Sequence, residues 1–76
     1  MISIEKARKK AEEYISGLGL HLGKAMDDGE YFIFSYVEEV DEAPVCVNKE
    51  TGEADDYFPP DHLEAFLNAK EAHSYW

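Results

Sequence analysis

The segment that most constrains the fold covers residues 30–38 and reads Glu-Tyr-Phe-Ile-Phe-Ser-Tyr-Val-Glu. Successive side chains of a β-strand point to opposite faces. In this segment the two sets are Phe32, Phe34 and Tyr36 on one face and Tyr31, Ile33, Ser35 and Val37 on the other. Both sets are largely apolar, whereas a strand with one face in water would alternate between apolar and polar residues. We therefore predict that residues 30–38 form the central strand of a sheet.

Weaker strand patterns flank this segment. Residues 18–26 begin by alternating leucine with glycine or histidine, and Asp27-Asp28-Gly29 then supplies a hairpin turn. Residues 44–48 form a short apolar strand, and residues 53–58 form a more polar strand that suits an edge. Because connections this short join only antiparallel neighbours, the sequence predicts a four-stranded antiparallel sheet.

Helical patterns occupy the two ends of the chain. Residues 3–16 predict an amphipathic helix with Ser3 as its N-cap. Its apolar stripe, at spacings of three and four, consists of Ile4, Ala7, Ala11, Tyr14, Ile15 and Leu18. A second, short helix is predicted from Asp61, after two prolines end the fourth strand. The expected fold is α+β, with an N-terminal helix packed on a four-stranded antiparallel sheet, a short C-terminal helix, and a single small domain over residues 1–76.

Size and charge exclude several classes of protein. The chain has 76 residues and one cysteine, so its core is small and no intramolecular disulfide supports it. The formal net charge is −10, which argues against direct binding of nucleic acid or of an anionic membrane surface. No run approaches the roughly 20 apolar residues of a transmembrane helix, and no signal-peptide pattern follows the start. We expect a cytoplasmic protein.

The negative charge is concentrated in the middle of the chain. Residues 27–64 contain thirteen acidic residues and one lysine, a net charge of −12. Residues 1–26 contain five basic and three acidic residues, a net charge of +2. This asymmetry favours a surface that faces a partner. The alternative is a solvated face that only keeps the protein soluble.

Candidate catalytic and metal-binding groups are few. His21, Cys46, His62 and His73 match no compact metal-ligand spacing, so no metal site is expected. Cys46 lies between two valines, where a cysteine behaves as a small hydrophobic residue, and it lies in an acidic stretch, whereas a reactive thiolate needs nearby positive charge. The carboxylate clusters do not follow an EF-hand spacing, and a general acid would need a pocket that raises its pKa. We expect no enzyme activity and no cofactor, while weak binding of a divalent cation stays open.

One hairpin carries a family resemblance. Residues 44–53 read Pro-Val-Cys-Val-Asn-Lys-Glu-Thr-Gly-Glu, a strand followed by a turn and a return strand. With the N-terminal helix and the aromatic middle strand, it resembles the YrhB-like, immunity protein 35 family of small bacterial proteins over roughly residues 4–67. Asn48 stands where that family often has Asp. Members of the family are thought to neutralise a cognate toxin, so the resemblance implies inhibition by binding, with no catalytic residues.

We therefore predict a non-catalytic domain that binds a protein partner, with toxin neutralisation as the function that the resemblance implies. An acidic surface suits a basic toxin domain, because complementary charge speeds encounter and gives specificity. Tyr57 and Phe58 are expected to add aromatic anchors. The predicted binding residues are Asp27, Asp28, Glu38, Glu39, Asp41, Glu42, Asp55, Asp56, Tyr57 and Phe58.

Two other functions stay open at this point. A phage or mobile element could use such a chain as a DNA mimic, with carboxylates presented like phosphates to a nucleic-acid-binding protein. The chain could also be an acidic accessory or chaperone-like domain. It could act as a monomer, or as a homodimer through the edge strand at residues 53–58, although the acidic residues there oppose pairing.

Overall fold

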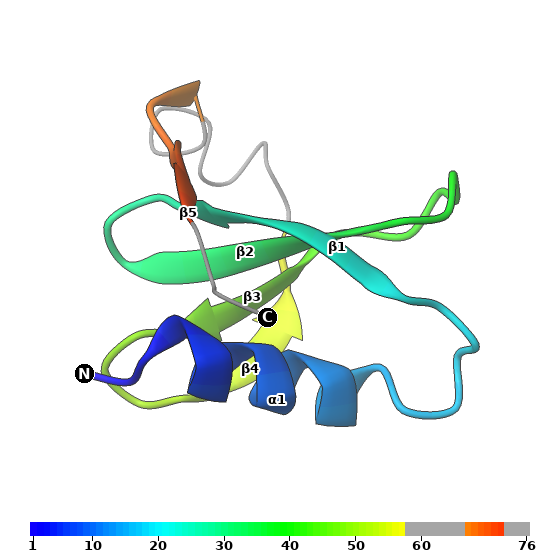
Figure 1. Cartoon of the computed structure of the whole chain (residues 1–76), viewed down its shortest axis with the longest axis horizontal. Helices are drawn as coiled ribbons and strands as arrows, with labels where there is room; N and C mark the ends of the chain where they lie inside the picture. The colour runs from blue at the N-terminus through cyan, green and yellow to red at the C-terminus, as the bar shows by residue number, and fades with distance from the viewer. Residues whose placement is uncertain (58–66, 73–76) are drawn as a thin grey trace.

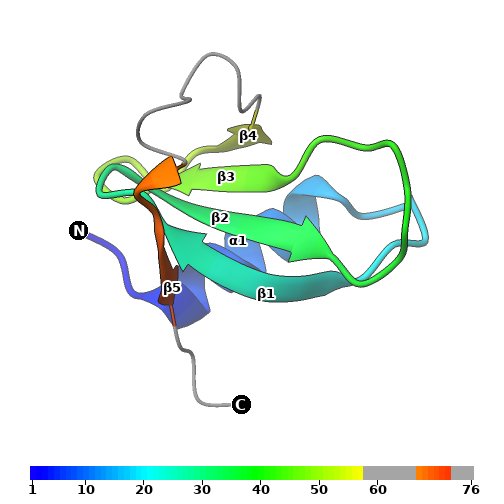
Figure 2. The ribbon, with the colours of Figure 1, turned by 90° about the horizontal axis from the view of Figure 1, so that it is seen from above.

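This computed structural model describes residues 1–57 and 67–72 of the chain, and these ranges contain one helix and five strands. They are α1 (Ile4–Tyr14), β1 (Leu22–Asp27), β2 (Tyr31–Tyr36), β3 (Val45–Asn48), β4 (Ala54–Asp56) and β5 (Lys70–Ala72). Helix α1 covers one face of the sheet (Figure 1). The strands follow the order β4-β3-β2-β1-β5, with every neighbouring pair antiparallel (Figure 2). The predicted α+β fold, a helix on an antiparallel sheet, is confirmed.

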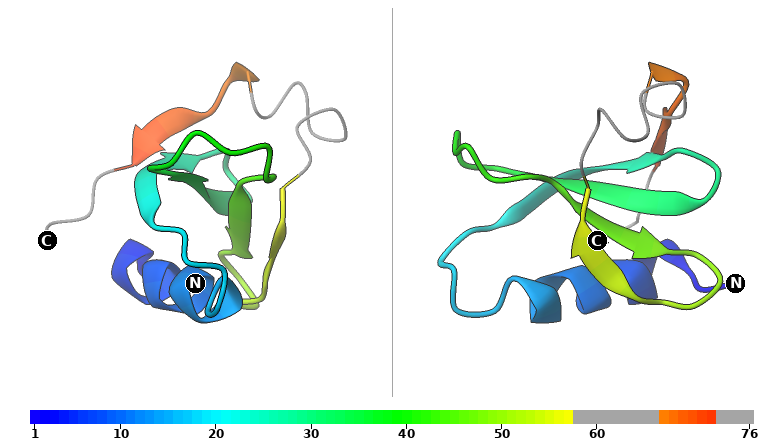
Figure 3. Two further views of the ribbon diagram at one scale, coloured as in Figure 1. Left: turned by 90° about the vertical axis from the view of Figure 1, so that its right-hand side faces the viewer. Right: turned by 180° about the vertical axis from the view of Figure 1, so that it is seen from behind.

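Helix α1 begins and packs as its sequence predicts. The hydroxyl of Ser3 accepts a hydrogen bond from the N–H of Lys6 at 3.2 Å and so caps the first turn. Ala7 and Ala11 are completely buried, and their small side chains let the helix lie close to the sheet, which curls over it (Figure 3). Tyr14, which was expected on the buried stripe, is 44% exposed instead. It lies in the last turn of the helix, where its hydroxyl reaches acidic residues of β4.

Strand β2 is central, as predicted, and its two faces belong to two apolar clusters. Phe34 packs on the helix side and Ile33 on the opposite side, and both are almost fully buried. The buried residues of the helix side are Ala7, Ala11, Ile15, Ala25, Phe34, Val45 and Val47. The buried residues of the opposite side are Ile33, Cys46 and Tyr57. The alternation along residues 31–36 thus gives each cluster its central side chain.

The first strand begins later than predicted. Residues 18–21 do not extend the strand, because Gly17 and Gly19 adopt positive φ angles of 94° and 73° and turn the chain. Leu18 donates its N–H to the carbonyl of Ile15 at 3.0 Å, which holds this turn against the end of α1. We refer to residues 15–21 as the α1–β1 loop.

Strand β5 was not predicted. Residues 70–72 pair with β1 in the register Ala25 to Ala72 and Asp27 to Lys70, so they close the edge of β1. The helix predicted from Asp61 falls on residues 58–66, which lie outside the described residues. The end of the chain, with Tyr75 and Trp76, lies outside them as well. Strand β4 lies at the other edge, as predicted.

Within the described ranges, no helix is both long enough and apolar enough to cross a membrane. Helix α1 spans 11 residues, against the roughly 20 that a bilayer requires.

Candidate functional site

The predicted binding residues lie at both ends of β2. Asp27 ends β1, and Asp28 follows it in the turn that leads into β2; we call this the turn end of the sheet. Residues 38–42 lie beyond the other end of β2, in the β2–β3 loop (residues 37–44), as Figure 2 shows. Asp55 and Asp56 of β4 pair with the start of β3, directly after this loop. Phe58 lies outside the described residues.

At the turn end, Asp28 is part of the structure. Its Oδ1 accepts hydrogen bonds from the N–H groups of Glu30 and Tyr31 at 2.9 and 2.7 Å, and its Oδ2 accepts one from the hydroxyl of Tyr57 at 3.0 Å. Tyr57 is 0% exposed. Burial, together with the hydrogen bond to Asp28, raises the pKa of Tyr57 to about 12. Tyr57 therefore presents no surface to a partner, and Asp28 holds the turn to the core.

Asp27 pairs with a buried cation. Its Oδ1 lies 2.5 Å from the Nζ of Lys49 and accepts the N–H of Gly29 at 2.8 Å. The Lys49 ammonium also lies 4.9 Å from the centre of the Phe32 ring, and Lys49 is only 9% exposed. Burial by itself would raise the pKa of Asp27, but the hydrogen bonds and the charge of Lys49 outweigh it, so the pKa is lowered. This carboxylate is also structural.

The remaining predicted acids gather at the opposite end of the sheet. We call this group the acidic end: Glu38, Glu39, Asp41, Glu42, Asp55 and Asp56. Burial raises the pKa of Tyr36, and the charges of Asp56 and Glu42 raise it further, so both carboxylates lie within electrostatic reach of one ring. All members except Glu38 are exposed. The structure thus brings together acids from the β2–β3 loop and from β4.

The β2–β3 loop is held to the α1–β1 loop by Glu38. Its Oε1 accepts the backbone N–H of His21 at 2.9 Å, and its Oε2 lies 2.6 Å from the Nδ1 of the same residue. The N–H of Val37 donates to the carbonyl of His21 at 2.8 Å. The hydrogen bond to the His21 ring, with the backbone N–H, lowers the pKa of Glu38 to about 2. Glu38 is therefore ionised at neutral pH and joins the two loops.

Helix α1 holds the acidic residues of β4. The Tyr14 hydroxyl donates to Asp56 Oδ1 at 3.1 Å and lies 3.5 Å from Asp55 Oδ1. Partial burial raises the pKa of Tyr14, and the hydrogen bond to Asp56 raises it further. The backbone N–H of Asp56 donates to Asp55 Oδ1 at 2.8 Å. Since a side chain already accepts this N–H, β4 is a poor template for pairing with a further strand.

Exposed apolar side chains lie in the α1–β1 and β2–β3 loops, and they are not among the predicted binding residues. Leu18, Val37 and Val40 are 58%, 66% and 42% exposed, and they lie in the two loops that Glu38 joins. The sequence predicts Leu18 both on the helix stripe and in the first strand, and Val37 in the central strand. Both side chains are exposed because α1 ends before Leu18, β1 begins after it and β2 ends before Val37. The signal that could have found Val40 is a lone valine within the acidic run Glu38-Glu39-Val40-Asp41-Glu42.

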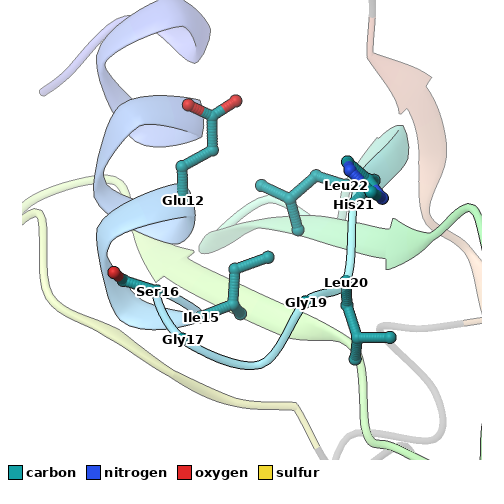
Figure 4. Close-up of a pocket in the computed structure, with 8 residues that line it drawn as sticks. All are labelled: Glu12, Ile15, Ser16, Gly17, Gly19, Leu20, His21 and Leu22. Carbon is teal, nitrogen blue, oxygen red and sulfur yellow. The ribbon is translucent and has the colours of Figure 1, made fainter.

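A groove of about 450 Å³ opens between the end of α1 and the α1–β1 loop. Figure 4 shows Ile15 and Leu22 directed into the groove, Glu12 on its helix wall, and Leu20 turned away. The residues that line it are Glu12, Ile15, Ser16, Gly17, Gly19, Leu20, His21 and Leu22. At Gly17 and Gly19 a Cβ atom would meet nothing within 4 Å, so glycine is required there by the positive φ angles rather than by a close contact.

The sequence contains two kinds of candidate reactive group, a cysteine and a set of possible metal ligands. Cys46 is buried on the face opposite α1, and burial raises the pKa of its thiol to about 11, which keeps it protonated and unreactive. Within residues 1–57 and 67–72, no three side chains of His, Cys, Asp or Glu come together in an arrangement that could hold a metal ion.

Comparison of the chain with protein-family profiles, with curated proteins and with solved structures found no match.

Proposed function

We propose that this protein is a non-catalytic binding domain whose acidic end recognises a basic surface on a protein partner. Neutralisation of a toxin, which the family resemblance implies, is the form of this function that we propose to test first. The observation that carries the proposal is the gathering, at one end of the sheet, of exposed acids with exposed Leu18, Val37 and Val40.

Two physical arguments support this function. Exposed carboxylates attract a basic partner over about 10 Å at ordinary salt, which raises the association rate. Apolar side chains among them would provide buried contact area once the partner is bound, because charged pairs at the rim contribute little on their own. The links from Glu38 to His21 and from Tyr14 to Asp56 hold this surface in place before binding, so less conformational entropy is lost on association.

The test compares two sets of charge reversals. The partner is captured from a lysate of the source organism, purified, and measured against the wild-type chain and against a triple variant, Glu39→Lys, Asp41→Lys and Glu42→Lys. The matched control reverses three exposed acids outside the acidic end: Glu5→Lys, Glu50→Lys and Glu53→Lys. We expect the acidic-end variant to lose affinity by at least about tenfold, with a weaker dependence on salt, and the control to lose much less.

The outcomes separate the open functions. Equal losses in the two triple variants would mean that only net charge matters, and would contradict a specific site at the acidic end. If the captured protein is a nucleic-acid-binding protein and duplex DNA displaces the chain from it, the function is DNA mimicry. If no partner forms a stable complex, the accessory-domain function is favoured. Neutralisation requires that the captured protein be toxic to cells and lose that toxicity in the complex.

A further inference from the structure

The groove beside α1 combines an apolar floor with a single carboxylate. Ile15 and Leu22 face each other across it, and Glu12 stands on its helix wall (Figure 4). A volume of about 450 Å³ falls within the range of about 300–1,000 Å³ that is usual for ligand sites. A long aliphatic chain that ends in a cation matches this combination, since its stem can lie on apolar surface while its head reaches a carboxylate.

Within the described ranges, the Glu12 carboxylate interacts with its neighbours only through its charge, which acts on the Arg8 guanidinium one helical turn earlier. Among the described residues, no hydrogen bond or ion pair joins it to another side chain. Arg8 precedes it by one helical turn, but its Nη2 donates to the carbonyl of Gly23 at 2.9 Å and its guanidinium lies 5.1 Å from the centre of the Phe34 ring. The guanidinium of Arg8 is thus directed to the sheet rather than into the groove, and Glu12 can accept a second cation.

The groove is continuous with the acidic end. His21 lines the groove and also holds Glu38, and Leu18 lies in the same loop. A partner that covers the acidic end would therefore pass over the mouth of the groove. Charge complementarity then favours a basic side chain at that point of the partner.

We propose that the groove between α1 and the α1–β1 loop accepts one arginine or lysine side chain of the protein partner. The aliphatic stem lies on Ile15 and Leu22, and the cationic head pairs with Glu12. This inference rests on the proposed function, because it names the anchor through which a basic partner would dock. Arginine is favoured over lysine, because its planar guanidinium can pair with a carboxylate through two hydrogen bonds.

A small probe tests the groove without the partner. The ¹⁵N-labelled full chain is titrated with hexylguanidinium chloride, which carries both a stem and a cation, and with guanidinium chloride and hexanol, which each carry one. We expect saturable shifts of the amide signals of Gly17, Gly19 and Leu22 with hexylguanidinium, and clearly weaker binding of the other two compounds. Diffuse shifts over the whole acidic end, or equal binding of guanidinium alone, would overturn the proposal.

Matched variants locate the cation. Glu12→Gln should weaken hexylguanidinium binding by about threefold, whereas Glu13→Gln, one residue along on the same exposed helix surface but not lining the groove, should leave it unchanged. Ser16→Lys should weaken it further, because Ser16 also lines the groove and a lysine there would occupy it with a competing positive charge, and Ser16→Gln controls for size. Glu12, Glu13 and Ser16 are all exposed, so the variants should fold. Unchanged amide signals of β2 and β3 would verify this. Equal binding by the Glu12 and Glu13 variants would overturn the proposal.

Failure of this inference can be told apart from failure of the proposed function. If reversing charges at the acidic end weakens partner binding but Glu12→Gln affects neither partner nor probe, the domain binds a basic partner without this anchor. If the probe binds through Glu12 but the acidic-end variant keeps full affinity for the partner, the groove is a cation site and the proposed function is wrong.

Discussion

The two ends of β2 use carboxylates in opposite ways. At the turn end, Asp27 and Asp28 are half-buried and accept hydrogen bonds from backbone N–H groups, from Lys49 and from the buried Tyr57. At the acidic end, the exposed side chains of Glu39 and Asp41 make no hydrogen bond within the described part of the chain. Both pairs fall within one acidic stretch of the sequence. The density of charge in the sequence therefore indicates a binding surface only when the carboxylates that stabilise the fold are left out of the count.

The largest expected effect is at Asp28. Asp28→Ala removes the acceptor of two backbone N–H groups and of the Tyr57 hydroxyl, and it leaves a cavity beside the turn. We expect a loss of about 2–4 kcal/mol in the free energy of unfolding, measured by urea denaturation. The matched variant at the other end, Asp41→Ala, should change it by less than about 0.5 kcal/mol. Similar losses in the two variants would break the comparison between the ends.

A smaller effect is expected from the ion pair of Lys49. Lys49→Met keeps the stem but removes the ammonium that pairs with Asp27 and lies over Phe32. Because the Asp27 side chain is 34% exposed, solvent screens the pair, and we expect a loss of about 1–2 kcal/mol rather than that of a fully buried pair.

The pair of Asp27 and Lys49 also makes the stability of the fold depend on pH. The pKa of Asp27 is lowered in the folded state, so the stabilisation is fully present above the unfolded pKa of about 3.9 and is lost as the pH falls through the lower folded value. The difference in stability between wild type and Lys49→Met should therefore shrink on acidification below about pH 4, when unfolding is followed at several pH values. A difference that stays constant would mean that Lys49 stabilises the fold by packing alone.

Much of the fold follows from local patterns, whereas the roles of the acids do not. The alternation through Ile33 and Phe34 predicts the central strand because each face of a strand must be buried. Strand β5 could not be predicted, since Lys-Glu-Ala has no strand preference and pairs only because the edge of β1 is near. The burial of Tyr57 depends on a contact with Asp28, far away in the chain, which composition and spacing do not encode. The groove beside Glu12 depends on how the α1–β1 loop turns, which the alternating leucines of residues 18–22 did not indicate.

The link between His21 and Glu38 offers a local measurement at the acidic end. His21→Ala removes the ring that lies 2.6 Å from Glu38 Oε2, although the backbone N–H of residue 21 can still donate. The pKa of Glu38, about 2 in the wild type, should rise toward that of an ordinary glutamate without fully reaching it, as followed by NMR of the side-chain carboxyl. The pKa of Asp27 should not move in the same variant, because Asp27 lies at the other end of β2.

The smallest effect on stability, and the sharpest contrast, is expected at the exposed acids of the β2–β3 loop. The triple variant Glu39→Gln, Asp41→Asn and Glu42→Gln removes three charges that make no hydrogen bond within the described residues. Removing like charges from a chain of net charge −10 relieves repulsion, so stability should stay equal or rise by up to about 0.5 kcal/mol. Binding to a basic partner should weaken in the same variant. Changing a residue that serves the fold lowers the stability of the protein, whereas changing a residue that serves binding lowers only its affinity for the partner. A triple variant that loses stability as Asp28→Ala does would show that the β2–β3 loop is a second structural turn, and its acids could no longer be assigned to a partner.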